Sequence, residues 1–316
     1  VSAGVEPFPG EQGLNERLVD AVSKGLLTAT TDTTGAVSES EAVIIVPPLV
    51  VNEDGVPDFT ALDRATEAVA LGLKPGALVS YETTLPVHAT RQRLAVKLSE
   101  LSGLKLGEDL FVVHSPERVY TGRVFSDLRR YPKLVGGLDE KSTLRGLELY
   151  TAILDFDDRP DLDRPNGVWP MESVEAAELA KLADTVYRNV NIGLANEFAV
   201  FSETIGVDVY DVIAAANSQP TSHIHRPGVA VGGHCIPVYP KFYLSNDPTA
   251  VIPAAAIDAN EAMPRHAVDT IIRRFGDLAS QKVAVLGAAY RGGVKEVAFS
   301  GVFPLVEYLL SLGAQV

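Results

Sequence analysis

The sequence predicts an α/β protein in which two parallel-sheet domains are joined by a long central helix. Short β-rich runs alternate with amphipathic stretches in the first half, which is typical of βαβ units. A segment without proline, rich in Ala, Leu and Glu, follows from Ser173 to about Ile205. After a second helical stretch the β-rich pattern begins again near residue 282.

Composition limits the classes of protein to consider. The chain has 316 residues and 46% hydrophobic content, enough to bury a core divided over two or three domains. A formal charge of -14 argues against nucleic acid or an anionic membrane as a partner. No apolar run has the length of a membrane span, no signal-peptide pattern is present, and one cysteine allows no internal disulfide. We therefore expect a cytoplasmic protein.

The first half contains four runs with the pattern of buried strands. They are Ala42–Val46, Ala77–Tyr81, Leu110–His114 and Lys133–Val135. Helix-period segments at 59–71 and 87–99 follow the first two runs.

Ligands of parallel α/β sheets bind beyond the carboxyl ends of the strands. Three loops lie at such positions, although each taken singly could be an ordinary turn. They are Val46-Pro47-Pro48, Glu82-Thr83-Thr84 and His114-Ser115-Pro116-Glu117.

The segment from Ser173 to about Ile205 predicts one helix, which would be roughly 50 Å long at 1.5 Å per residue. A helix of that length either bridges two domains or forms a dimer interface. Lys181, Thr185 and Arg188 share one of its faces by their spacing. A solvated face is the usual reason for such a trio.

The last third predicts a helix at Val251–Phe275, a strand at Lys282–Leu286, a helix at Gly301–Leu312 and the start of a strand at Ala314–Val316. A sheet domain needs more strands than these, and the chain opens in a loop without a Gly-x-Gly-x-x-Gly turn. We expect the sequence to be part of a longer protein, truncated at both terminal parts of the fold.

Cys235, the single cysteine, lies in Val231-Gly232-Gly233-His234-Cys235-Ile236-Pro237. A lone thiol can pack in a core, bind a metal or act as a nucleophile. The paired glycines favour the nucleophile, because they remove side chains where a ligand would approach. His223, His225 and His234 lie nearby without the tight, repeated spacing of zinc ligands, so we expect no metal.

Several motifs occur in an order that resembles the UDP-glucose/GDP-mannose dehydrogenase family over nearly the whole chain. They are Ala29-Thr30-Thr31-Asp32, Glu82-Thr83-Thr84-Leu85-Pro86, Ser115-Pro116-Glu117-Arg118-Val119 with Gly122, Glu178-Leu179-Ala180-Lys181-Leu182, Tyr187-Arg188-Asn189-Val190-Asn191-Ile192 with Asn196-Glu197, and Gly232-Gly233-His234-Cys235-Ile236-Pro237. Arg118 and His234 resemble the branch that oxidises UDP-N-acetylglucosamine or UDP-N-acetylmannosamine at carbon 6.

The resemblance implies a domain plan. Residues 1–165 would form a Rossmann-like NAD-binding domain without its first strand, 166–262 a central helical dimerisation and catalytic domain, and 263–316 the start of a Rossmann-like UDP-sugar-binding domain. It also implies a homodimer through the central helix. The uronic acid product would supply a surface polysaccharide or a secondary metabolite.

The implied reaction is an NAD-dependent, four-electron oxidation of a primary alcohol to a carboxylate. Cys235 would form a thiohemiacetal and then a thioester. Lys181 would stabilise oxyanion charge with help from Thr185, Glu117 would activate the hydrolytic water, and Thr84 would position water.

Binding roles follow from the same motifs, and the choice of NAD over NADP rests on the family alone. The residues implied for the cofactor are Val46, Pro47, Glu82, Thr83 and Thr84. The residues implied for the UDP-sugar are Glu117, Arg118, Lys181, Arg188, Gly228, Gly232, Gly233, His234 and Arg291.

Some positions depart from the family pattern. Thr185 replaces an asparagine, Tyr239 an aspartate and Ala298 an arginine, and Val229-Ala230 replace Pro and Gly. Two alternatives therefore stay open. One is an enzyme for UDP-glucose or another nucleotide sugar; the other is a catalytically impaired nucleotide-sugar binding protein.

Overall fold

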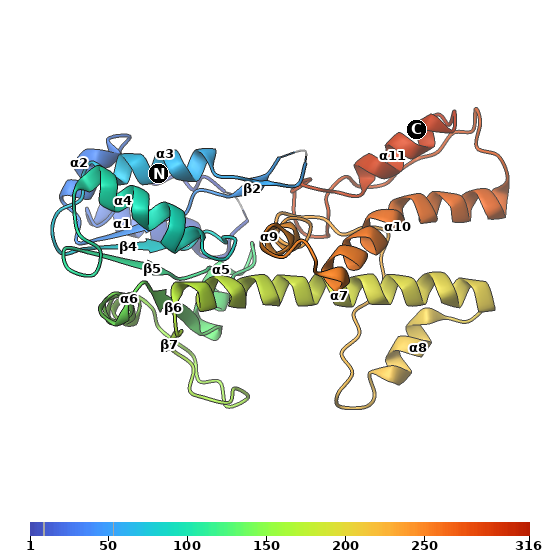
Figure 1. The fold of residues 1–316 in the computed structure, drawn as a ribbon. Coiled ribbons are helices and arrows are strands. Elements are labelled where there is room, and N and C mark those ends of the chain that lie inside the picture. The colour runs from blue at the N-terminus through green and yellow to red at the C-terminus, as the bar shows by residue number, and fades with distance from the viewer. Residues whose placement is uncertain (9, 53) are drawn as a thin grey trace. The chain divides into compact units, whose positions relative to one another are not determined.

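The computed structural model describes residues 1–8, 10–52 and 54–316 (Figure 1). The chain divides into two compact units. Unit 1 comprises Val1–Val50 and Asp58–Lys181, and unit 2 comprises Val51–Pro57 and Leu182–Val316. The domain limits expected at residues 165 and 262 stay a prediction.

Unit 1 contains a five-stranded sheet in the order β1-β4-β5-β6-β7. Its strands are β1 (Ala42–Ile45), β4 (Ala77–Tyr81), β5 (Leu110–His114), β6 (Lys133–Gly137) and β7 (Val168–Pro170). The α/β class and all four expected strand positions are thus confirmed. Strands β4, β5 and β6 are buried at every residue, as strands covered on both faces should be.

The sheet is mostly parallel, as expected, but one pairing is antiparallel. Strands β1, β4 and β5 are parallel, but β6 runs antiparallel to β5, with Val113 opposite Gly137 and His114 opposite Gly136. The only helix between them, α5 (Val124–Arg130), has 7 residues. It is about 10 Å long, shorter than the roughly 16 Å that five strand residues span, so this helix alone does not carry the chain back along the sheet.

Helices cover both faces of this sheet. Tyr81 contacts Thr66 of α3 (Thr60–Ala70), whereas the preceding Ser80 contacts Tyr150 of α6 (Glu140–Ile153). Because successive side chains of a strand point to opposite faces, α3 and α6 lie on opposite sides (Figure 1). The remaining bounds are α1 (Leu14–Ser23), α2 (Thr33–Ser38), β2 (Val50–Val51), β3 (Pro57–Asp58) and α4 (Ala95–Ser102).

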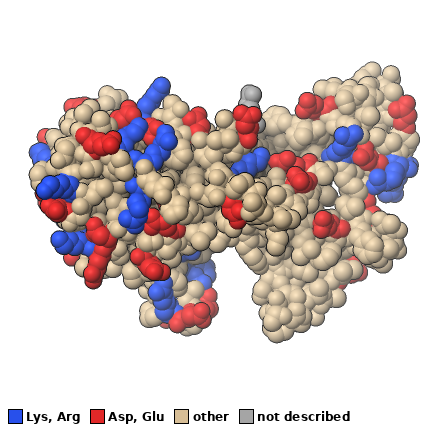
Figure 2. Space-filling model, in the orientation of Figure 1, with Lys and Arg blue, Asp and Glu red and all other residues tan. Residues whose placement is uncertain are grey.

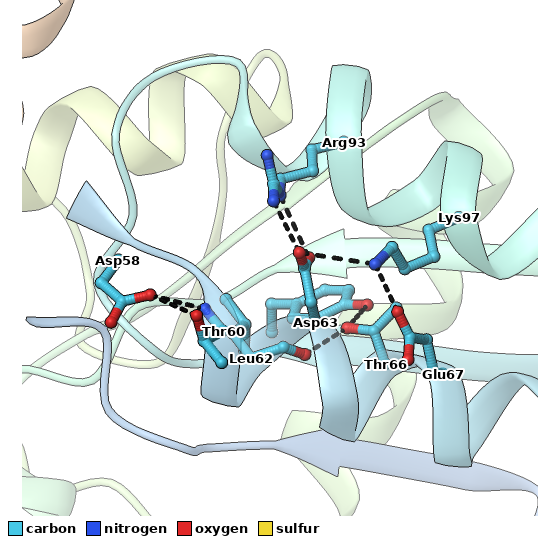
Figure 3. A network of polar contacts seen from close by, with 9 residues as sticks. Asp58, Thr60, Leu62, Asp63, Thr66, Glu67, Arg93 and Lys97 are labelled. Atoms are coloured by element: carbon cyan, nitrogen blue, oxygen red, sulfur yellow. Dashed lines mark hydrogen bonds and ion pairs between the residues drawn. The ribbon is translucent and has the colours of Figure 1, made fainter. Parts of the chain in front are cut away.

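Charged pairs join α3 to Arg93 of the turn η1 (Thr90–Leu94) and to Lys97 of α4 (Figure 3). Arg93 donates twice to Asp63, at 3.0 and 2.6 Å, and Lys97 lies 3.4 Å from Asp63 and 2.7 Å from Glu67. The Arg93 hydrogen bonds are the main cause that lowers the pKa of Asp63. The cluster thus links α3 to both η1 and α4.

The helix expected at 87–99 begins instead as a π-helical turn, η1 (Thr90–Leu94), and continues as α4. The buried carboxylate of Glu178 accepts from the backbone N–H groups of His88 (2.7 Å) and Thr90 (2.8 Å) and from the Thr90 hydroxyl (2.6 Å). These acceptors hold the start of η1, where backbone N–H groups lack helical partners.

The long helix α7 (Val174–Ile205) has 32 residues and confirms the predicted central helix. Unit 2 also contains α8 (Val209–Ala216), α9 (Tyr239–Asn246), α10 (Val251–Phe275) and α11 (Val302–Ser311). The last two helices enclose a small core of Val268, Leu278, Leu309 and Ala314.

The strand predicted at Lys282–Leu286 is wrong beyond its first residues. Lys282 forms a single parallel bridge with Gln315, and Val283 donates to the Gln315 carbonyl at 2.8 Å. Leu286 is 93% exposed. Among the described residues, the run forms no bridge beyond the one at Lys282.

Within the described residues, no helix combines the length and apolar character needed to cross a bilayer. Figure 2 shows Lys and Arg side chains interspersed with Asp and Glu on the face that it presents.

Candidate active site

In unit 1 the structure brings together the loops that follow β1, β4 and β5. The N–H of Glu82 donates to the Ile45 carbonyl (3.1 Å), and the N–H of Glu117 donates to the Glu82 carbonyl (3.2 Å). The Thr83 hydroxyl donates to the Pro47 carbonyl at 2.7 Å. Candidate residues from all three loops therefore line one edge of the sheet.

Lys133 lies among these residues, although sequence reasoning did not select it. Its ammonium is 3.0 Å from Glu82 Oε1 and 2.9 Å from Glu117 Oε2, and its side chain is only 5% exposed. It also lies over the Tyr150 ring, 4.9 Å from the centroid. The one signal in the sequence was a lysine at the first position of a predicted buried strand, because a buried lysine needs a charged or polar partner.

The antiparallel direction of β6 explains why Lys133 lies beside Glu82 and Glu117. His114 pairs with Gly136, so the position three residues after His114 (117) lies opposite the position three residues before Gly136 (133). A parallel β6 would have carried Lys133 to the opposite edge of the sheet.

Tyr150 and His114 lie close to the ion cluster of Lys133, Glu82 and Glu117. Burial, followed by the charge of Glu82, raises the pKa of Tyr150. The phenol therefore stays protonated and donates to Glu82 Oε1 at 2.7 Å. Burial, assisted by the charge of Lys133, lowers the pKa of His114 to about 3, so its imidazole is neutral at physiological pH.

Other unit 1 candidates differ in exposure. Thr84 and Lys181 are buried, Val46 is 61% exposed, and the Arg118 guanidinium donates to the Pro132 carbonyl. This edge of the sheet fits a dinucleotide, because the parallel strands β1, β4 and β5 end there. It exposes the apolar side chain of Val46, next to the Pro47 carbonyl that accepts from the Thr83 hydroxyl.

In unit 2 asparagines of α7 hold the irregular segment ahead of the thiol. The Asn191 side chain donates to the His223 carbonyl (2.7 Å) and accepts from the His225 N–H (2.8 Å). Asn196 accepts from the N–H of Gly228 at 2.9 Å. The segment is therefore anchored at three backbone groups.

Residues 228–235, which we call the thiol loop, pack against residues 290–298. A Cβ at position 232 would lie 2.5 Å from Tyr290 Cβ, and a Cβ at position 233 would lie 2.9 Å from Tyr290 Cε2. Gly233 also has φ +85°, in the region that favours glycine. Both glycines are needed for the tyrosine to approach the loop backbone.

Cys235 is partly exposed at the end of this loop. Its carbonyl accepts from the N–H groups of Val238 (3.3 Å) and Tyr239 (2.9 Å), which begins the turn into α9. His234 Nε2 lies 3.6 Å from Glu296 Oε2. Arg291 Nε donates to the Tyr290 hydroxyl at 3.2 Å. His234 thus lies beside the 290–298 segment, to which Arg291 itself belongs.

The solvated face proposed for Lys181, Thr185 and Arg188 is wrong. Lys181 is 5% exposed, Thr185 is fully buried, and the Arg188 side chain is 19% exposed. The Thr185 hydroxyl donates to the Leu182 carbonyl at 2.9 Å. Tertiary packing therefore covers this face despite its polar composition.

No metal-binding cluster is found in the part of the chain that the structure describes: no three His, Cys, Asp or Glu side chains there could hold an ion together.

Family models match most of the chain. The NAD binding domain of the UDP-glucose/GDP-mannose dehydrogenase family matches residues 5–154, and the central domain of that family matches residues 175–264.

Individual proteins agree with this match. The UDP-N-acetyl-D-mannosamine dehydrogenase of Pyrococcus horikoshii is 34% identical over 306 residues, covering 95% of this chain and 69% of the relative. The NDP-N-acetyl-D-galactosaminuronic acid dehydrogenase of Ralstonia solanacearum is 32% identical, covering 92% of this chain and 67% of the relative. The chain thus spans about two thirds of their length. A solved structure of UDP-D-ManNAc dehydrogenase from Pyrococcus horikoshii superposes with a TM-score of 0.91 at 33% identity, covering 100% of this chain and 73% of that one.

Proposed function

Since the chain belongs to the UDP-glucose/GDP-mannose dehydrogenase family, we propose that it oxidises carbon 6 of a UDP-N-acetylhexosamine to a carboxylate. The family is NAD-dependent, and its NAD binding domain matches residues 5–154. The observation that carries the proposal is the thiol loop, in which two glycines packed on Tyr290 lead to a partly exposed Cys235.

The overall reaction converts R–CH2OH, two NAD⁺ and one water into R–COO⁻, two NADH and three protons. When bound, NAD supplies the acceptor for both hydrides. The Cys235 thiolate would add to the aldehyde carbon to give a thiohemiacetal. Loss of a hydride and the hydroxyl proton then gives a thioester, and water breaks the C–S bond and returns the thiol.

Lys181 and Glu117 would serve this sequence in different ways. A buried ammonium at Lys181 suits the stabilisation of oxyanion charge, because electrostatic interactions strengthen away from water. Glu117, with a side chain that is 32% exposed, would take a proton from the hydrolytic water. Thr84 would position that water.

Binding would use the remaining candidates. Amides of the thiol loop, from Gly228 to Gly233, suit a diphosphate, and Arg291 would pair with the same group. Further substrate contacts would come from Arg118, Arg188 and His234 and cofactor contacts from Val46, Pro47, Glu82 and Thr83.

We also propose a homodimer through α7. Large apolar side chains on this helix are exposed in the single chain: Leu179 (44%), Leu194 (43%), Phe201 (61%) and Ile205 (54%). A second copy would cover them.

The substrate class follows from the named relatives. One oxidises UDP-N-acetyl-D-mannosamine and the other carries the name of an N-acetyl-D-galactosaminuronic acid dehydrogenase, so both names indicate N-acetylated sugars. This favours an acetamido sugar over UDP-glucose. The second candidate function is a catalytically slow nucleotide-sugar binding protein, which is favoured by the donation of the Thr185 hydroxyl to its own helix.

The test is NADH formation by the full-length protein with UDP-N-acetylmannosamine, UDP-N-acetylgalactosamine, UDP-N-acetylglucosamine and UDP-glucose. We expect two NADH per acetamido sugar, and no carboxylate from the Cys235→Ala variant. Sugar binding without NADH from any substrate would instead support the binding protein.

A further inference from the structure

We propose that Lys133 is a positioning residue, which holds the Glu117 carboxylate in one orientation at the carboxyl edge of the sheet. Glu82 and Tyr150 hold Lys133 in turn. The kinetic consequence rests on the proposed function, whereas the contact itself does not.

Both oxygens of Glu117 have a donor. Oε1 accepts from the N–H of Arg118 at 2.6 Å, and Oε2 accepts from Lys133 Nζ at 2.9 Å. Two fixed donors on one carboxylate define its rotamer and the direction of its remaining lone pairs. A water activated by Glu117 would therefore meet a base of fixed geometry.

Lys133 is itself fixed from two other sides. Glu82 Oε1 is 3.0 Å away and also accepts from the Tyr150 hydroxyl, while the Tyr150 ring lies 4.9 Å from the ammonium. The hydroxyl of Tyr150 also meets Ser80 Oγ at 2.7 Å. A 5% exposed lysine with these partners has little freedom to turn away from Glu117.

The orientation of Glu117 depends on the positive charge of Lys133. Two carboxylates, Glu82 and Glu117, share one ammonium and are linked by the Glu117 N–H to Glu82 carbonyl bond of 3.2 Å. Without Lys133 the carboxylates would repel each other, and Glu117 would swing toward solvent.

Loss of Lys133 should slow thioester hydrolysis and leave binding intact. Lys133→Met is expected to lower kcat about 10- to 100-fold, part of the 10²–10⁴-fold that a positioned base supplies. The kcat/KM values for NAD and sugar should stay within about twofold, because only the step after thioester formation is slowed, and the apparent KM should fall together with kcat. Intact-protein mass spectrometry during turnover should show a sugar adduct on Cys235 that wild type does not accumulate. Lys133→Arg, which retains the charge, should restore most of kcat.

The matched control is Lys97→Met, because Lys97 also bridges two carboxylates of unit 1, Asp63 and Glu67 (Figure 3). It should show neither the kcat loss nor the adduct. Equal losses in both variants, or a Lys133→Met enzyme that falls in kcat without an adduct, would overturn the positioning role. If Lys133→Met does not fold, Lys133→Gln takes its place.

A double-mutant cycle separates this proposal from the proposed function. Urea unfolding of wild type, Lys133→Met, Glu117→Gln and the double variant should show coupling of about tenfold or more in the unfolding equilibrium constant. Additive effects would overturn the proposal even in an active enzyme. Absence of NADH from wild type would refute the proposed function, while the cycle would still decide whether Lys133 holds Glu117.

Discussion

The backbone N–H of Gly233 donates to the carbonyl of Ala298 at 2.8 Å. The family pattern has an arginine at position 298, but this contact to the thiol loop comes from the main chain and does not depend on the side chain. This bond requires the thiol loop to lie close to the 290–298 segment. Gly232, the residue before Gly233, should therefore be sensitive to substitution.

Gly232→Ala should unfold more easily than wild type, by about 1–3 kcal/mol, because the new Cβ would lie 2.5 Å from Tyr290 Cβ and 2.9 Å from the Phe299 carbonyl. Urea unfolding gives the stability, and the rate of Cys235 alkylation reports the loop. Gly292→Ala is the control, because nothing lies within 4 Å of its Cβ. Equal behaviour of the two variants would show that the loop does not pack on Tyr290.

Glu178 should make stability fall as pH rises. Burial raises its pKa from 4.5 to about 7 despite the donors at His88 and Thr90. Between these pH values the folded protein keeps a proton that the unfolded chain releases, so stability present below pH 4.5 is lost as pH approaches and passes 7. The full loss is about 3 kcal/mol.

Unfolding in urea at pH 5 and pH 8 measures this loss. Glu178→Gln has no proton to release, so its stability should depend less on pH than that of wild type. Glu172→Gln removes an exposed carboxyl and controls for net charge. The same pH dependence in all three proteins would contradict the expectation.

Thr185→Asn should increase kcat several-fold, because the longer amide provides donors that the resembled family uses on the oxyanion. Thr185→Val should leave kcat within about twofold, since the hydroxyl already donates to the Leu182 carbonyl. NADH formation at saturating sugar measures both. A large loss in Thr185→Val would instead assign the hydroxyl a direct part in the reaction.

Strand positions could be predicted because buried parallel strands are short, continuous apolar runs. The direction of β6 could not, since it depends on how far α5 carries the chain, which the apolar pattern of Lys133–Val135 does not encode. Lys133 was missed for the same reason. Its partners Glu82 and Glu117 become neighbours only once β5 and β6 are antiparallel.

The α7 face shows a different limit. Residue type alone favours solvent for Lys181 and Arg188, but tertiary contacts cover both. The run at Lys282–Leu286 has the composition of a buried strand, yet Lys282 alone forms a bridge in the described residues and Leu286 is exposed. In each case local sequence describes what a residue prefers, and the remainder of the chain decides its surroundings.

Packing of Tyr290 on Gly232 and Gly233 restricts how this protein can be re-engineered. The cysteine-bearing loop is not a portable module: grafted into another scaffold without the 290–298 segment, it would lose the surface that shapes it. Libraries that diversify position 290 should therefore keep both glycines, and those that diversify position 232 should include glycine at 290, because the closest contact is to the Tyr290 Cβ. Chimeras between relatives should exchange the two segments as a single block.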